Sequence, residues 1–476
     1  MLIHKFQTAS GRRYVYDAWT NEILEVDAEI YDALPPRSGN SAELSPRVAT
    51  EIASARQAGL LREDRPDVRS FPPAERARLL RRLKERGPEL LILNVTERCN
   101  LRCRYCPWSG AYEDNRTHSE RVMPEETLRK AIAWYLSFPR DADSISFYGG
   151  EPLCDLELIR RAVDFALDLA KRPIQFRITT NATLLHPRAC DFLAKHDFRL
   201  SVSIDGPQEV HDRYRLFGDG RGSFAAVWKG LETLRSSHPD YFRKRVAYNV
   251  VAASPARLIA IRDFFASHPE FFASHRLSIS RVNPYPSCLP EFLLGGWRDP
   301  EFRAQREEAF GEFRARLLRG EIDTDDFHFQ LFADNFIDMH QRVTVPMKPA
   351  VPSHGQCVPG GAKCFVDTDG SLHMCERVGD GRPIGHVSTG LDLRAISRFL
   401  REYDEFFRAC CADCWALRLC SKCFVHLRVG GEFSTSRRAE VCATEQRKWS
   451  WIIRQYCEIR EEKADAFAWC KGIPAV

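Results

Sequence analysis

Cysteine is the residue type whose spacing in this chain most directly suggests chemistry. The sequence contains seventeen cysteines, and most of them fall in two groups separated by a long stretch of ordinary composition. The first group is Cys99, Cys103 and Cys106, and the second runs from Cys357 to Cys442. Thiolates at gaps of two or three residues are how a chain wraps an iron–sulfur cluster. The sequence therefore predicts clusters held at two ends of one enzyme.

The first group has C-x3-C-x2-C spacing and follows an apolar run that ends at Val95. Three thiolates hold three irons of a four-iron cube, which leaves the fourth iron open to a ligand that chelates through an amine and a carboxylate. A zinc site is the alternative. It normally needs a C-x2-C pair and a fourth Cys or His, and His118 is near enough in sequence to supply that ligand.

A glycine motif, Gly149-Gly150-Glu151, follows the next apolar run. Two glycines let the backbone approach a ligand closely, and a carboxylate accepts a hydrogen bond from an ammonium group, although a simple strand-ending turn is the alternative. Together with the cysteine spacing, with Asn100 and with the aromatic Tyr105, this motif resembles the radical S-adenosylmethionine (radical SAM) superfamily. The resemblance implies S-adenosylmethionine as cofactor and a [4Fe-4S] cluster on Cys99, Cys103 and Cys106.

By the same resemblance, polar residues at the ends of later strands contact the cofactor, and Arg215 pairs with its carboxylate as a two-pronged fork. A surface ion pair is the alternative role for Arg215. The predicted cofactor-binding residues are Tyr105, Gly149, Gly150, Glu151, Asn181, Ser203, Asp205 and Arg215.

The second cysteine group resembles the SPASM extension of radical SAM enzymes, although Cys423 follows Cys420 at x2 where that pattern has x3. The resemblance implies two auxiliary [4Fe-4S] clusters, and so three clusters in all. One would be held by Cys411, Cys414, Cys420 and Cys442. The other would be held by Cys357, Cys375 and Cys423, with Cys364 as the candidate fourth ligand.

Two further points about this group stay open in the sequence. Repeated C-x2-C pairs also fit a pair of structural zinc ions, and Cys410 lies beside Cys411 where it could enter the ligand set. Glu376 directly follows a predicted ligand and resembles the proton acceptor of sulfatase-maturing relatives. It is therefore a candidate catalytic base, with a structural role beside Arg377 as the alternative.

The elements that must position these residues alternate between strand and helix from residue 89. Short β-rich runs occur at 90–95, 144–148, 176–180, 200–204, 246–251 and 277–282, with helical stretches such as 125–138, 156–171 and 224–236 between them. This order predicts an α/β fold, a partial (β/α)6 TIM-like barrel, with functional residues at the carboxyl ends of the strands. Residues 291–350 are predicted to be a helical bridge, and residues 351–476 a small domain organised by metal.

Residues 1–68 read as a separate module. Runs at 13–17 and 22–26 predict a hairpin, and stretches at 28–34 and 45–61 have helical spacing, which together suggest a winged-helix-like unit. Residues 69–88 are predicted to be a linker helix, and the barrel to span 89–290. Such a module resembles the precursor-recognition element of ribosomal peptide pathways, where a strand edge binds an extended leader peptide.

Composition limits the class of protein. At 44% hydrophobic and 28% charged residues the chain is typical of a globular protein, and no signal peptide or apolar run of membrane-spanning length is present, so we expect a cytoplasmic protein without a membrane partner. A net charge of +4 is too mild to indicate nucleic acid.

The whole pattern most resembles radical SAM/SPASM peptide maturases that install thioether crosslinks. The resemblance implies that a 5′-deoxyadenosyl radical abstracts hydrogen from a precursor peptide and that a flavodoxin or ferredoxin supplies electrons. The alternatives are a carbon–carbon crosslink, sulfatase-maturase-like oxidation of a Cys or Ser side chain, and a zinc-organised peptide-binding scaffold without catalysis.

Overall fold

The computed structural model describes residues 1–34, 44–112, 115–253, 257–282, 300–348, 350–353, 357–378, 382–471 and 473. Cys288 lies outside these residues. Among the described residues, no helix is both long enough and apolar enough to cross a membrane.

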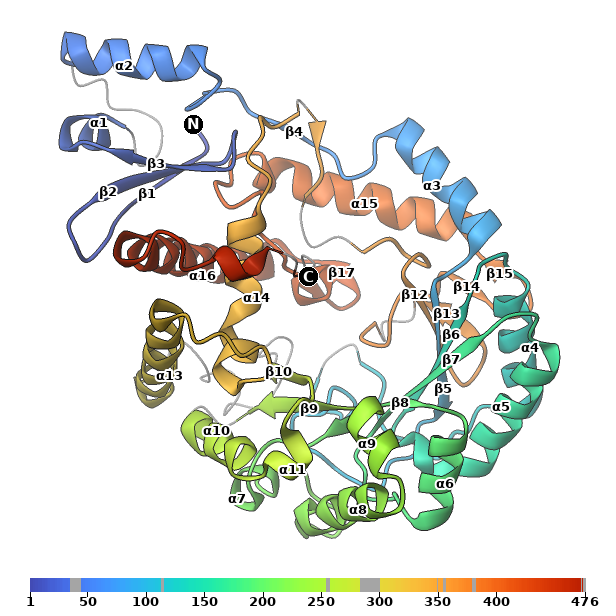
Figure 1. The fold of residues 1–476 in the computed structure, drawn as a ribbon. Helices are drawn as coiled ribbons and strands as arrows, with labels where there is room; N and C mark the ends of the chain where they lie inside the picture. Colours follow the sequence, from blue (N-terminus) through green and yellow to red (C-terminus); the bar gives the residue numbers. More distant parts are fainter. Residues whose placement is uncertain are drawn as a thin grey trace.

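A parallel sheet forms the centre of the molecule. All six predicted strands are confirmed, and each pairs in parallel with its sequence neighbour. Their carboxyl ends therefore meet at one edge of the sheet. Figure 1 shows helices along the outer side of this curved sheet. The strands are β5 (Leu90–Thr96), β6 (Asp143–Gly149), β7 (Ile174–Thr180), β8 (Arg199–Ser203), β9 (Val246–Ala252) and β10 (Leu277–Arg281).

The helices of this region arise from amphipathic stretches between the strands. In α5, for example, Leu158, Ile159, Ala162, Val163 and Ala166 are buried at helical spacing. The helices are α4 (Glu125–Leu136), α5 (Leu156–Leu169), α6 (Pro187–Lys195), α7 (Gln208–His211), α8 (Phe224–Ser237), α9 (Pro239–Arg245), α10 (Leu258–Ser267) and α11 (Pro269–Phe272), with a short 3₁₀ turn, η1, at Pro152–Asp155.

The cysteine-rich region extends the same sheet instead of standing apart. Strand β12 (Lys363–Val366) pairs in parallel with β5, and three short antiparallel strands follow it, giving one ten-stranded sheet. These are β13 (Ser371–His373), β14 (Gly385–His386) and β15 (Gly390–Leu391). The sequence signal was too weak to predict this continuation, because the strands have two to four residues each.

The cysteine-rich region also contains two long helices, which were not predicted from the sequence. They are α15 (Leu393–Cys411) and α16 (Thr435–Glu462). In α15, Ile396, Leu400, Tyr403 and Phe407 are buried at helical spacing. The sequence of this segment therefore contains the apolar stripe of an amphipathic helix. The region also contains the 3₁₀ turns η3 (Phe424–Leu427) and η4 (Ala468–Cys470), and the hairpin β16 (Arg428–Val429) with β17 (Glu432–Phe433).

Within residues 300–348, the predicted bridge contains two helices that pack on the rest of the chain, α13 (Pro300–Arg319) and α14 (Phe327–Gln341). Aromatic contacts join them: the Phe310 ring stacks on that of Phe336 at 5.8 Å, and Trp451 of α16 meets Phe310 at 4.6 Å. This packing explains the phenylalanine-rich composition of the bridge.

The N-terminal module has one strand more than the predicted hairpin. Strand β1 (Ile3–Gln7) pairs with β2 (Arg13–Asp17), which pairs with β3 (Glu22–Val26), all antiparallel. Helices α1 (Ala28–Ala33) and α2 (Pro46–Gln57) follow, with Asp27 and Ser45 as their N-caps. Figure 1 places the module beside α16, and the backbone N–H of Ala9 donates to Glu458 of that helix at 3.0 Å.

The segment after this module is tied to the C-terminal part of the chain. Strand β4 (Asp67–Val68) pairs in parallel with β11 (Ala350–Val351). The backbone N–H of Ser70 donates to Asp404 of α15 at 2.8 Å. Helix α3 (Pro73–Arg86) then occupies the predicted linker and leads into β5.

Candidate functional site

The loop after β5 carries the first cysteine group. Cys99, Cys103 and Cys106 are all partly buried, and the backbone N–H of Cys106 donates to the carbonyl of Cys103 at 3.0 Å, which tightens the turn between them. The loop is held from outside by Tyr214, whose carbonyl accepts from the Arg104 N–H at 2.9 Å. The three thiols therefore lie together at the carboxyl end of the first barrel strand.

The electrostatics of these thiols fit a cluster. Burial raises the pKa of all three, and the neighbouring thiols raise the pKa of Cys99 further. Buried thiols that disfavour each other's ionisation need a positive centre between them to become thiolates. An iron–sulfur cluster supplies that charge, so this donor set fits the [4Fe-4S] cluster that the sequence predicts.

His118 lies beside this group. Its Nε2 is 3.7 Å from the Cys106 sulfur, and its Nδ1 is 3.4 Å from the carbonyl oxygen of Glu97. Among the described residues, no three His, Cys, Asp or Glu side chains are grouped closely enough to hold a single metal ion.

The glycine motif packs against the cysteine loop itself. A Cβ on Gly149 would lie 2.3 Å from the carbonyl oxygen of Thr96, and one on Gly150 would lie 2.2 Å from that of Arg98. The backbone N–H of Gly150 also donates to Thr96 at 2.8 Å. Both glycines therefore lie close to the chain's own backbone, which fixes the position of the cysteine loop. Their predicted contact with the cofactor stays a prediction.

Glu151 is buried and forms hydrogen bonds within the protein. Its side chain is 1% exposed, and it accepts hydrogen bonds from the Leu153 N–H at 3.0 Å, the Thr180 hydroxyl at 2.7 Å and the Asn181 N–H at 2.7 Å. Burial raises the pKa of Glu151 to about 7. These hydrogen bonds join the ends of β6 and β7, and the predicted contact between this carboxylate and the cofactor's ammonium group stays a prediction.

Asn181 and Ser203 end the next two strands. The Asn181 amide donates to Asn100 at 2.9 Å, and the Asn100 amide donates to the Thr183 hydroxyl at 2.7 Å. Asn100 belongs to the cysteine loop, so this network joins that loop to the end of β7. Ser203 is partly buried at the end of β8, in register with Asn249 of β9.

Asp205, Arg215 and Tyr105 form one buried network. Arg215 donates to the two carboxylate oxygens of Asp205 at 2.9 and 3.1 Å, and Tyr105 donates its hydroxyl to the same carboxylate. Charges on Arg215 and Asp205 influence Cys103, whose pKa burial raises to about 12. Arg215 is therefore buried and is not a surface ion pair. Two of its nitrogens bind Asp205, and its predicted pairing with the cofactor carboxylate stays a prediction.

Three of the C-terminal cysteines, Cys357, Cys375 and Cys423, interact through charge. Burial is the main cause that raises the pKa of Cys375 and Cys423, and smaller charge interactions link Cys423 to Cys375 and to Cys357. The Cys364 thiol is fully buried in β12, on the opposite face from Lys363, and burial alone raises its pKa. Cys364 is therefore a core residue, and its predicted part in this ligand set stays a prediction.

A second set of thiols lies between the end of α15 and the start of α16. Charge interactions link its members, and Cys410 also contacts the Cys411 sulfur at 3.6 Å and shares a hydrogen bond with Cys442. Five thiols therefore lie near one another here, whereas a [4Fe-4S] cluster binds four. They are Cys410, Cys411, Cys414, Cys420 and Cys442.

Glu376 forms a two-pronged ion pair with Lys363, whose Nζ lies 2.9 Å from both carboxylate oxygens. The Glu376 side chain is only 16% exposed. Arg116 donates to the Glu376 carbonyl at 3.2 Å, and its guanidinium lies between the rings of Trp108 and Phe365, at 4.3 and 4.2 Å. Glu376 is thus positioned between the cysteine loop and Cys375.

Arg116 and Lys363 are site residues that sequence reasoning missed. Nothing in their local sequence marks them: Lys363 pairs with Glu376 thirteen residues later, and Arg116 contacts partners from a distant part of the chain. Asp367 of the cysteine-rich region, for instance, lies 3.8 Å from Arg116.

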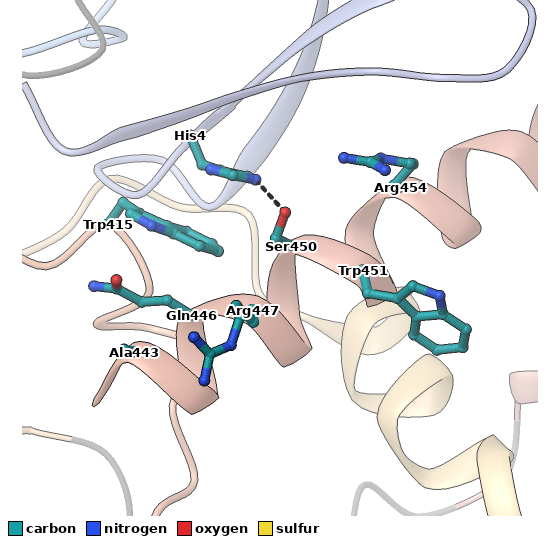
Figure 2. Close-up of a pocket in the computed structure, with 8 residues that line it drawn as sticks. All are labelled: His4, Trp415, Ala443, Gln446, Arg447, Ser450, Trp451 and Arg454. Carbon is teal, nitrogen blue, oxygen red and sulfur yellow. Dashed lines mark hydrogen bonds between the residues drawn. The ribbon is translucent and has the colours of Figure 1, made fainter. Parts of the chain in front are cut away.

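Figure 2 shows a surface pocket of this region. Its cavity volume is about 500 Å³. It lies where β1, the loop after Cys414 and one face of α16 meet, and Gln446 in its wall donates to the Cys414 sulfur at 3.4 Å. The lining residues are His4, Trp415, Ala443, Gln446, Arg447, Ser450, Trp451 and Arg454.

Comparison with known proteins agrees with this geometry. The chain is 36% identical over 151 residues to protein MJ0907 of Methanocaldococcus jannaschii, covering 32% of this chain and 50% of that protein. It is 33% identical over 186 residues to a serine-type anaerobic sulfatase-maturating enzyme of Bacteroides thetaiotaomicron, covering 38% and 41%. The match thus spans half or less of these relatives.

The fold is similar to that of a solved structure of native anSMEcpe with bound AdoMet and Cp18Cys peptide. The TM-score is 0.57 at 18% identity, and the match covers 81% of this chain and all of that one. Residues 93–251, which hold the first cysteine group and the strand ends around it, match the model of the radical SAM superfamily. The chain therefore contains a radical SAM domain.

Proposed function

We propose that this protein is a radical SAM enzyme that abstracts a hydrogen from a peptide substrate and installs an intramolecular crosslink. The observation that carries the proposal is the grouping of Cys99, Cys103 and Cys106 at the carboxyl end of β5. A cluster on these thiolates would supply the electron that cleaves S-adenosylmethionine, which generates the radical that attacks the substrate.

The chain's own residues prepare this site. Gly149 and Gly150 let the end of β6 hold the cysteine loop, and Glu151 ties β6 to β7. The Asp205–Arg215 pair fixes Tyr105 next to the cysteines. Cofactor atoms would then meet the exposed parts of these strand ends, with Asn181 and Ser203 at the next two positions along the sheet.

Two auxiliary clusters form the second part of the proposal. The set of Cys357, Cys375 and Cys423 offers three thiolates, and we assign its free iron position to a substrate thiolate. Such an arrangement favours a thioether as the bond made. Glu376, which follows Cys375, is the candidate base, and Lys363 holds its carboxylate in place.

The peptide substrate is supported by two further observations. The related enzyme is named for sulfatase maturation, and the solved anSMEcpe structure contains a peptide. In the N-terminal sheet, β3 pairs with β2 on one side, and its other edge has no strand partner among the described residues. A leader peptide can add to such an edge through main-chain hydrogen bonds.

A sulfatase-maturase-like oxidation of a Cys or Ser side chain is the second candidate function, favoured by the similarity to the Bacteroides enzyme. That reaction would also use Cys99, Cys103 and Cys106, so it differs only in substrate and product. A carbon–carbon crosslink is the third possible product.

The test of the radical chemistry is anaerobic incubation of the reconstituted protein with S-adenosylmethionine and dithionite. We expect 5′-deoxyadenosine from the native chain and none from a variant with Cys99, Cys103 and Cys106 all changed to Ala. Equal product from both proteins would contradict the assignment.

The test of the substrate is co-expression with the small open reading frame next to the gene, followed by tandem mass spectrometry of the peptide. Loss of two hydrogens localised to cysteine supports a thioether, and localisation to a ring carbon supports a carbon–carbon crosslink. Hydrogen–deuterium exchange tests the binding module: added peptide should protect residues 22–26, and unchanged exchange there would contradict strand addition.

A further inference from the structure

The pocket in Figure 2 is positively charged. Arg447 and Arg454 are exposed along one face of α16, and none of the eight lining residues carries a carboxylate. Arg447 donates to the neutral hydroxyl of Thr444 at 3.2 Å. Two guanidinium groups on one helix face favour an anionic partner and disfavour a basic one.

The opposite wall is flat and aromatic. The imidazole of His4 stacks on the indole of Trp415 with ring centroids 4.1 Å apart and an interplanar angle of 13°. His4 is fixed by a hydrogen bond between its Nε2 and the Ser450 hydroxyl at 2.9 Å. Because β1, α16 and the loop after Cys414 hold this wall in place, it is ready to bind without rearrangement.

The pocket adjoins the five-thiol set through two covalent or hydrogen-bonded links. Trp415 directly follows Cys414 in the chain, and Gln446 donates to the Cys414 sulfur at 3.4 Å. A protein that occupies the pocket therefore comes close to any cluster held by Cys411, Cys414, Cys420 and Cys442.

We propose that this pocket is the docking site of an acidic electron-transfer protein of the flavodoxin or ferredoxin class. Carboxylates of the partner pair with Arg447 and Arg454, and its surface covers the Trp415–His4 wall. The donor passes one electron to the auxiliary cluster: the donor is oxidised by one electron, the cluster is reduced by one, and no bond or proton moves. The inference rests on the proposed auxiliary cluster.

Proximity to the thiols favours a redox protein over an acidic segment of the peptide substrate. Electron-transfer partners form weak, transient complexes, and a small charged site of this kind suits such a complex. Attraction between opposite charges speeds association without making the complex long-lived. The acidic peptide is nevertheless the main competing occupant, and the test separates the two.

The test compares two double charge reversals that change net charge equally. Arg447→Glu with Arg454→Glu alters the pocket, and Arg78→Glu with Arg81→Glu alters two exposed arginines of α3, far from α16 in Figure 1. The readout is the Kd for oxidised flavodoxin by titration calorimetry at low and high salt. We expect the pocket variant to bind about tenfold or more weakly at low salt. The α3 variant should bind like the native chain.

A second readout measures reduction of the auxiliary cluster by stopped-flow absorbance, in a background where Cys99, Cys103 and Cys106 are Ala. Flavodoxin hydroquinone should reduce the pocket variant more slowly, while dithionite, which needs no docking, should reduce all variants alike. Equal flavodoxin rates and affinities in both double variants would overturn the docking site. Arg447→Ala with Arg454→Ala replaces the reversal if circular dichroism shows misfolding.

Two outcomes distinguish the remaining cases. If the pocket variant keeps its flavodoxin affinity but loses affinity for the precursor peptide, the pocket binds peptide and the proposal is wrong. If the reconstituted protein contains no auxiliary iron, the proposal of auxiliary clusters is wrong. The calorimetric comparison then still decides whether flavodoxin binds the pocket.

Discussion

Arg215 donates two hydrogen bonds to Asp205 in a site where their side chains are only 8% and 2% exposed. Removing one partner of such a pair leaves an uncompensated buried charge. Asp205→Asn or Arg215→Met should therefore lower stability by about 3–5 kcal/mol. The double variant should lose less than the sum, and Arg213→Met, at an exposed neighbour, should change little. Thermal unfolding midpoints provide the measurement, and additive losses would contradict the pairing.

Gly150 should not tolerate a side chain. A Cβ there meets the Arg98 carbonyl at 2.2 Å, so Gly150→Ala must displace the cysteine loop. We expect a loss of about 1–3 kcal/mol and reduced iron loading at the first cysteine group. Gly218→Ala is the matched control, because a Cβ at Gly218 has no heavy atom within 4 Å. Equal iron loading in the two variants would be inconsistent with this role of Gly150.

Cys364 and Cys375 should respond differently to alanine substitution. Cys364 is a core residue of β12, so Cys364→Ala should keep its iron and lose only about 1 kcal/mol or somewhat more of packing. Cys375→Ala should lose about four irons, the content of one cluster. Iron and acid-labile sulfide assays after reconstitution test this, and iron loss from Cys364→Ala would restore it as a ligand.

Variants of Glu376 and Lys363 can distinguish a catalytic from a structural role of Glu376. Both oxygens of Glu376 lie 2.9 Å from the Lys363 amine. If Glu376 is the base, Glu376→Gln should reduce peptide product by about 100-fold or more. Lys363→Met removes the same ion pair but leaves the carboxylate, so it should retain much more product. Comparable losses in both variants, measured as product per 5′-deoxyadenosine, would indicate a structural pair.

His211 should make the protein sensitive to acid. It is fully buried, its Nδ1 accepts from the Asp205 N–H at 3.3 Å, and burial lowers its pKa from 6.5 to about 3. Below pH 6.5 His211 binds a proton in the unfolded chain but stays neutral in the folded chain. The free energy of unfolding therefore decreases as the pH falls toward 3. The contribution is about 1.4 kcal/mol per pH unit. His211→Asn should be less stable at pH 7.5 but have a flatter stability profile between pH 6.5 and 4.

The sequence by itself determined the strands of the parallel sheet and the grouping of the first three cysteines in one loop. Each strand from β5 to β10 is a short apolar run between amphipathic helices, and this local pattern is enough to predict parallel order. Cys99, Cys103 and Cys106 lie within one loop, so their spacing alone brings their thiols together.

Only the tertiary structure decided which distant residues meet. Cys364 has a side chain that could bind metal, but its position in β12 directs that side chain toward the hydrophobic core. Tyr105 donates to Asp205, and Arg116 donates to the Glu376 carbonyl, because strands and loops far apart in the chain converge there. Such contacts depend on the register and side-chain direction of packed elements, which no local spacing specifies.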